Sequence, residues 1–152
     1  MDQLILAEKL ESLRRCINRI DEKKPSQVEL LIDNPDIQDI LVLNLTRAVQ
    51  LCVDIGSHII SESDETAPKT MGDVFEILQK LKIISAKTCQ QMKKAVGFRN
   101  VAIHNYAAIN WKIVYVICKN SLDDFRAFAK EVSHQESQQT AAMSSEHLRK
   151  NP

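Results

Sequence analysis

The sequence contains few of the residues that favour sharp turns, with three glycines and four prolines in 152 residues. A sheet of short strands needs frequent turns, so this scarcity argues against a β architecture. Apolar residues recur at three- and four-residue spacing instead of alternating with polar ones. A chain of this length forms one domain around one core. The sequence therefore predicts a single all-α domain.

An excess of either charge is also absent, because twenty basic and twenty acidic residues cancel. This balance excludes a protein that coats nucleic acid through a broad positive surface, so any RNA site must be local. The stretch 80–99 carries six basic residues and no acidic one, namely Lys80, Lys82, Lys87, Lys93, Lys94 and Arg99. It is a candidate RNA contact, and an ordinary solvated helix face explains it equally well.

Paired metal-binding or redox cysteines are missing too. The four cysteines form no C-x-x-C pair, have no histidine at zinc spacing and each lie in a predicted helix, so we expect small core residues: Cys16, Cys52, Cys89 and Cys118. No secretory signal opens the sequence, and no apolar run approaches the roughly 20 residues of a membrane span. We therefore expect a cytoplasmic protein with no membrane partner.

The apolar periodicity predicts about five amphipathic helices. Candidate capping residues precede several of them, because a side-chain oxygen at Thr70, Ser85 or Asn110 can accept a hydrogen bond from the first helical turn. The predicted helices cover residues 3–21, 36–62, a short stretch after Thr70, 86–104 and 111–133. Together they form a domain over residues 1–134. Residues 135–152 are rich in Gln, Ser, Glu and Thr, which predicts a polar tail that is disordered or packs on a neighbouring molecule.

One stretch of the sequence contains residues suited to catalysis. Arg99, His104 and Tyr106 form the pattern Arg-x4-His-x-Tyr at the end of the predicted helix 86–104. An arginine holds a phosphate oxygen through a fork of N–H donors, and a histidine exchanges a proton near neutral pH. These two groups suffice for cleavage of RNA without a metal ion.

The pattern, with Asn100 directly after the arginine, resembles the signature of HEPN-domain ribonucleases. The added His-x-Tyr resembles the HepT toxins of type VII HepT–MntA toxin–antitoxin systems, and residues 38–59 are similar to the second helix of that family. The resemblance covers about residues 3–133. It implies a HEPN-type helical bundle that forms a homodimer and acts as a toxin, a metal-independent endoribonuclease without a cofactor.

The resemblance also implies a role for each motif residue. Arg99 and His104 are the expected catalytic residues, and Asn100 supports them. Tyr106 is the expected site of AMPylation by an MntA-like nucleotidyltransferase antitoxin, the expected protein partner, which silences the toxin. The RNA substrate is a tRNA or an mRNA. The alternative is a non-catalytic helical interaction module that scaffolds or regulates a nucleotidyltransferase.

The spacing of the motif raises a geometric problem. On a regular helix, Arg99 and His104 lie about 140° apart around the axis and about 7.5 Å apart along it. Two arrangements would bring them to one phosphate: the helix loosens after Ala102, or a second copy of the chain faces the first across a two-fold axis. The macrodipole at the helix C-terminus favours a cation, which suits His104 as a general acid.

Other polar residues have more ordinary expected roles. His58 stands four residues after Asp54, so we expect a local contact on the helix surface. Four polar residues on the largely apolar helix 36–62 are set apart from the catalytic residues and are expected to form a hydrogen-bond network or dimer contacts, with a place in the RNA cleft as the lesser alternative: Asp39, Asn44, Arg47 and Asp54.

Overall fold

The computed structural model describes the backbone of residues 3–150 and the side chains of residues 3–135, 137 and 138. No strand occurs within this part of the chain, so the predicted all-α class is confirmed. The elements are α1 (Gln3–Lys23), α2 (Val28–Ile32), α3 (Pro35–Ser61), α4 (Met71–Lys80), α5 (Ala86–His104), the 3-10 turn η1 (Tyr106–Ala108), α6 (Trp111–Asn120) and α7 (Leu122–Lys150).

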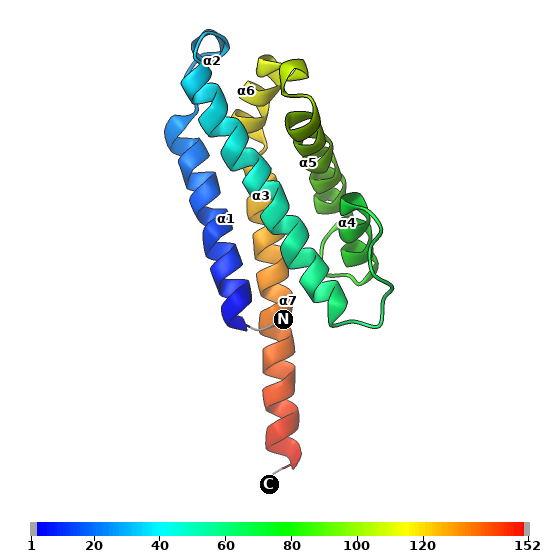
Figure 1. The fold of residues 1–152 in the computed structure, drawn as a ribbon. Helices are drawn as coiled ribbons and strands as arrows, with labels where there is room; N and C mark the ends of the chain where they lie inside the picture. Colours follow the sequence, from blue (N-terminus) through cyan, green and yellow to red (C-terminus); the bar gives the residue numbers. More distant parts are fainter. Residues whose placement is uncertain (1–2, 151–152) are drawn as a thin grey trace.

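Helix α3 is the central element of the bundle. Figure 1 shows it crossing in front of α7, with α1 on one side and α4 and α5 on the other. It packs against all four of these helices and contributes twelve buried residues to the core. By length and composition alone this helix could cross a membrane, contrary to the expectation that no apolar run approaches that length. Most of its apolar stretch is buried inside the bundle. It therefore reads as the core helix of this fold.

The predicted capping residues begin their helices as expected. The side chains of Thr70 and Ser85 each accept a hydrogen bond from the N–H three residues further on. Asn110 accepts from the first turn of α6 in the same way. The start of α5 is also fastened to α7, because the Glu131 carboxylate accepts the Ser85 N–H at 2.7 Å and the Thr88 hydroxyl at 2.6 Å. These two hydrogen bonds fix the N-terminal end of α5 against α7.

Two helical boundaries differ from the prediction. The polar connection before α3 contains the short helix α2, which is anchored through Leu31, its one buried residue. The last predicted helix is divided at Ser121 into α6 and α7. A new helix starts there because Asp123 and Asp124 place negative charge in its first turn, where the helix macrodipole favours it.

Helix α7 runs without a break through the predicted domain boundary at residues 134 and 135. The prediction that residues 135–152 form a disordered tail falls mostly on residues whose side chains the structure does not describe, and it stays a prediction.

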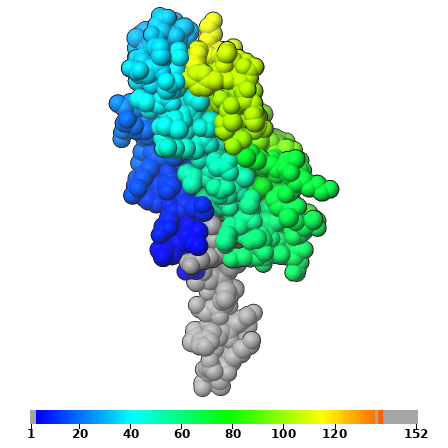
Figure 2. Space-filling view, viewed as in Figure 1, coloured from blue at the N-terminus to red at the C-terminus, as the bar shows by residue number. Residues whose placement is uncertain are grey.

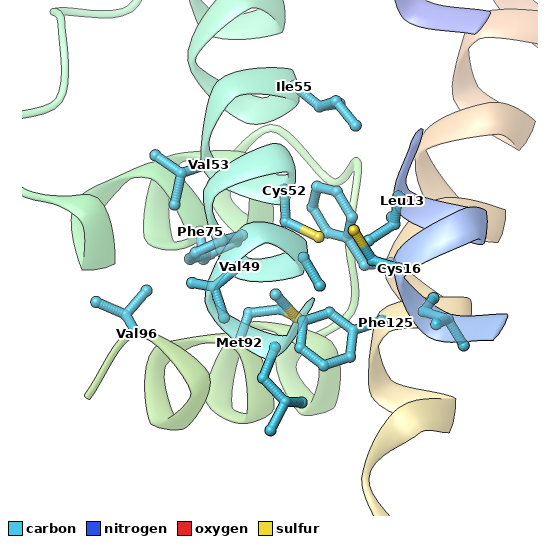
Figure 3. Packing of buried hydrophobic residues seen from close by; sticks show 14 of the residues in the cluster. Leu13, Cys16, Val49, Cys52, Val53, Ile55, Phe75, Met92, Val96 and Phe125 are labelled. Carbon is cyan, nitrogen blue, oxygen red and sulfur yellow. The ribbon is translucent and has the colours of Figure 1, made fainter. Parts of the chain in front are cut away.

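The core confirms the prediction for the cysteines, since all four are free and buried. Figure 3 shows Cys16 of α1 and Cys52 of α3 among apolar side chains such as Met92. Burial raises the pKa of the Cys52 thiol well above its ordinary value and that of Cys118 to about 12. These thiols are therefore protonated packing groups at neutral pH.

Candidate functional site

The motif residues lie where α5 ends. Arg99 and Asn100 belong to its penultimate turn, His104 is its last residue, and Tyr106 opens η1. The helix stays regular to this point, because the Asn105 N–H still donates to the Val101 carbonyl at 2.8 Å. The loosening after Ala102 considered from the sequence is therefore not present. Arg99 and His104 remain on different faces of α5 within one chain.

Arg99 is half-buried against α3. One of its terminal nitrogens donates to the Gln50 Oε1 at 3.3 Å, and the other donates to the Asn100 Oδ1 at 3.3 Å. The Gln50 amide in turn donates to the Asp54 Oδ1 at 2.9 Å, so its oxygen is turned toward the arginine. A chain of three side chains, Asp54–Gln50–Arg99, thereby holds the guanidinium.

The charge of Arg99 has no anionic partner in the part of the chain that the structure describes. Both hydrogen-bond acceptors are neutral amides, and the buried Nε atom has no hydrogen-bond partner. Buried N–H donors normally have acceptors. The guanidinium is thus positioned by α3 while its positive charge stays available to an anion.

His104 presents its imidazole to solvent at the C-terminus of α5. Within the described residues it makes no hydrogen bond and no ion pair. The negative end of the helix dipole stabilises a cation at this position. The side chain is free to approach a bound molecule and exchange a proton with it.

Tyr106 is held between α3 and α6. Its hydroxyl donates to the Asp39 Oδ1 at 2.5 Å, and its ring meets the edge of Trp111 with ring centres 5.8 Å apart. Burial, together with the hydrogen bond to Asp39 and the charge of that carboxylate, raises the pKa of the phenol to about 12. The phenol is therefore protonated at neutral pH, although the residue as a whole is 42% exposed.

Some polar residues of α3 form hydrogen bonds of the kind expected, because Asp54 is joined through Gln50 to Arg99 and Asp39 accepts from Tyr106. The Asn44 amide donates to a carbonyl of its own helix, and Asp54 accepts from Gln50. His58 pairs with Glu62 at 3.6 Å, so its predicted contact with Asp54 is wrong, although the pairing is local as expected. The Asp54 carboxylate is turned toward the preceding turn, where Gln50 supplies a donor four residues away.

The basic residues near the motif do not form one free patch. Lys80 pairs with Glu65 at 3.1 Å, and Lys93 pairs with Glu76. These pairs support the interpretation of the stretch 80–99 as largely a solvated helix face.

A groove between α1 and α3 carries positive charge that sequence analysis missed. It is lined by Ser12, Arg15, Cys16, Arg19, Asn44, Arg47, Gln50, Leu51 and Asp54. Gln50 belongs both to this groove and to the chain that holds Arg99. In Figure 2 the cyan atoms of α3 lie between the blue atoms of α1 and the green and yellow-green atoms of α5 and η1.

The four side chains outside the motif that define its surroundings come from other parts of the chain: Asp39, Gln50, Asp54 and Trp111. The Gln50–Asp54 spacing of four was a signal in the sequence, since such pairs meet on a helix surface. The contacts of Tyr106 with Asp39 and of Arg99 with Gln50 join residues 67 and 49 positions apart. No local sequence pattern predicts these two contacts.

Comparison with known proteins adds three findings. Residues 7–132 match the family model described as Ribonuclease HepT-like. The chain is 32% identical over 124 residues to the mRNA nuclease HepT of Shewanella oneidensis, covering 82% of this chain and 92% of that protein. It is 20% identical over 133 residues to the tRNA nuclease HepT of Aphanizomenon flos-aquae, covering 88% and 90%.

A solved structure extends the likeness to the fold. The tri-AMPylated Shewanella oneidensis HEPN toxin, in complex with MNT antitoxin, superimposes with a TM-score of 0.80 at 30% identity. The matched region covers 86% of this chain and 97% of that one.

Proposed function

Because this chain belongs to the HepT-like ribonuclease family, we propose that it is the toxin of a type VII toxin–antitoxin pair and cleaves RNA without a metal ion. One observation carries the proposal. The end of α5 presents both Arg99, which is held in place and whose charge has no anionic partner among the described residues, and the solvent-facing His104. The first group binds a phosphate and the second exchanges protons. Toxin and RNA meet in the cytoplasm.

The proposed reaction is an internal transfer at phosphorus. The ribose 2′-oxygen bonds to the adjacent phosphorus, the bond to the 5′-oxygen breaks, and a 2′,3′-cyclic phosphate remains on the upstream product. His104 transfers a proton to or from the reacting oxygens, while Arg99 stabilises the charge that accumulates on the phosphorus oxygens. Asn100 supports this site by accepting from the Arg99 guanidinium.

The groove between α1 and α3 supports RNA as the substrate. Arg47 has no ion pair in the part of the chain whose side chains are described, and Arg15 and Arg19 pair only with residues of their own helix, at 3.4 and 3.5 Å. Exposed ion pairs of this kind are weak, so a phosphate can replace the carboxylate. A nucleotide strand leaving Arg99 therefore enters a surface suited to its backbone.

Incubation of the purified chain with RNA in EDTA tests the proposal. We expect cleavage with 2′,3′-cyclic phosphate ends, because no step uses a metal ion. Intact RNA at high protein concentration would instead favour the alternative, a helical interaction module that binds nucleotide or phosphate without cutting.

The site is proposed to act as a homodimer. One chain keeps Arg99 and His104 on different faces of a regular helix, whereas a two-fold axis can set the arginine of one copy beside the histidine of the other. Exposed apolar side chains next to the motif support this, namely Val101 and Ile103 on α5 and Leu43 on α3. Leu43 lies between Asp39 and Gln50 on the stripe of α3 that faces the motif.

Replacing Ile103 with aspartate should therefore convert a dimer into a monomer and lower cleavage at least tenfold. Ile103 is 51% exposed, so the change costs the single chain little and acts on the interface. Light scattering at micromolar concentration measures the mass. Ile5→Asp is the matched control, because Ile5 is 39% exposed near the start of α1, far from the end of α5 in Figure 1. A fully active monomer would contradict the dimer.

Control of the toxin is proposed to act on Tyr106. The partner is an MntA-like nucleotidyltransferase that attaches AMP to the phenol, as the tri-AMPylated state of the Shewanella oneidensis toxin suggests. The AMP phosphate would lie near Arg99 and His104 and compete with RNA for the same donors.

A further inference from the structure

The hydrogen bond from Tyr106 to Asp39 has no role in RNA cleavage as proposed above. Asp39 lies in the second turn of α3 and Tyr106 opens η1, so the bond crosses between two elements. Both side chains are exposed. A nucleotide held by a partner enzyme can therefore reach the phenol oxygen while Asp39 remains in contact with it.

A phenol must lose its proton when it becomes bonded to phosphorus. The pKa of Tyr106 is raised to about 12. At pH 7 the phenolate is then only about one molecule in 100,000. Direct attack by preformed phenolate would be slow, so efficient transfer needs a base at the phenol oxygen.

The candidates for this base are few. Among the charged groups that the structure describes, the Asp39 carboxylate alone acts on the phenol, and its oxygen already accepts the proton to be removed. The neighbour on α6 is the indole of Trp111, which packs against the ring and has no acceptor for a proton. His104, two residues before the tyrosine, makes no hydrogen bond within the described part of the chain.

We propose that Asp39 is the general base for AMP transfer to Tyr106, so that the toxin supplies part of the catalytic machinery of its own inactivation. The phenol oxygen attacks the α-phosphorus of ATP, and its proton passes to the Asp39 carboxylate. The bond from that phosphorus to the oxygen bridging the β-phosphate breaks, and pyrophosphate leaves. The inference rests on the proposed function, which makes Tyr106 the modified residue.

Asp39→Asn is the direct test. The amide keeps the size of the side chain and can still accept the phenolic hydrogen bond, but it cannot take up the proton at neutral pH. We expect AMP transfer by an MntA-like nucleotidyltransferase and ATP, followed by intact mass, to slow at least about 100-fold at pH 7. Asp36→Asn removes the same charge one turn earlier on α3 and should keep the wild-type rate, because Asp36 has no described contact with Tyr106.

The pH profile separates proton transfer from mere positioning. Without the base, hydroxide must generate the phenolate, so the rate of Asp39→Asn relative to wild type should rise about tenfold per pH unit from 7 to 9. Taking the ratio at each pH cancels the partner enzyme's own pH dependence. Asp39→Glu retains a carboxylate, so it should restore part of the rate of AMP transfer. Its rate relative to wild type should change less with pH than that of Asp39→Asn.

Three results decide between the possibilities. Wild-type rates in Asp39→Asn, or a deficit that does not change with pH, would overturn the role of Asp39 as base and leave the modification of Tyr106 standing. Wild-type chain that gains no AMP at Tyr106 would refute the proposed modification itself. Circular dichroism checks that Asp39→Asn is folded, and if it is not, the pH ratio of Asp39→Glu decides the question.

Discussion

Replacing His104 with alanine should reduce RNA cleavage by at least about 100-fold while leaving the fold and the proposed dimer intact. The side chain is exposed and makes no hydrogen bond among the described residues, so its loss costs little folding free energy. What disappears is the group that we propose transfers a proton. Initial cleavage rates of a labelled RNA, with circular dichroism and light scattering alongside, measure both parts.

Arg99→Ala should lower cleavage to a similar extent through a different effect, the loss of charge stabilisation at phosphorus. Arg99→Lys keeps the charge but loses the fork that contacts Gln50 and Asn100, so it should restore only part of the activity. His58→Ala is the control for both, because that histidine pairs with Glu62 on α3 away from the motif. Wild-type cleavage by either alanine variant of the motif would remove the site assignment.

Tyr106→Phe should make the chain resistant to its antitoxin. The ring can still pack against Trp111, but the variant lacks the oxygen that is proposed to accept AMP. RNA cleavage should stay within a few-fold of wild type, whereas incubation with the partner enzyme and ATP should add no mass and cause no loss of activity. Under the same conditions wild type should gain AMP and lose activity in parallel.

Tyr115→Phe is the matched control, because Tyr115 is the other of the two tyrosines and donates to the Ser26 carbonyl at 3.0 Å, away from the motif. It should be modified and silenced like wild type. AMP on Tyr106→Phe at the wild-type level, or undiminished cleavage by fully modified wild type, would defeat the proposed control.

Most of the fold could be predicted because local sequence patterns determine where its helices lie. Apolar residues at three- and four-residue spacing identified the long helices, and capping residues such as Ser85 set where they begin. The division at Ser121 was missed because the apolar stripe continues across it, from Cys118 to Leu122 and Phe125. Periodicity reports which side of a segment is buried and is insensitive to a break of one residue.

The site was predicted only in part, for a related reason. The motif gave Arg99, Asn100, His104 and Tyr106, but a periodic pattern does not specify how far one helix slides along another. That axial position decides that Gln50 meets Arg99 and that Asp39 meets Tyr106. The partners of the motif therefore emerge only once α3 and α5 are packed together.

The burial of the cysteines has a consequence for how the cell can regulate this protein. Oxidants react with thiolates that they can reach, and the thiols of Cys16, Cys52, Cys89 and Cys118 are enclosed, each with a pKa raised by burial. Peroxide or disulfide stress should therefore leave these four thiols unmodified. The proposed transfer of AMP to the Tyr106 oxygen depends on ATP and a partner enzyme, so this form of regulation would be separate from the redox state of the cell.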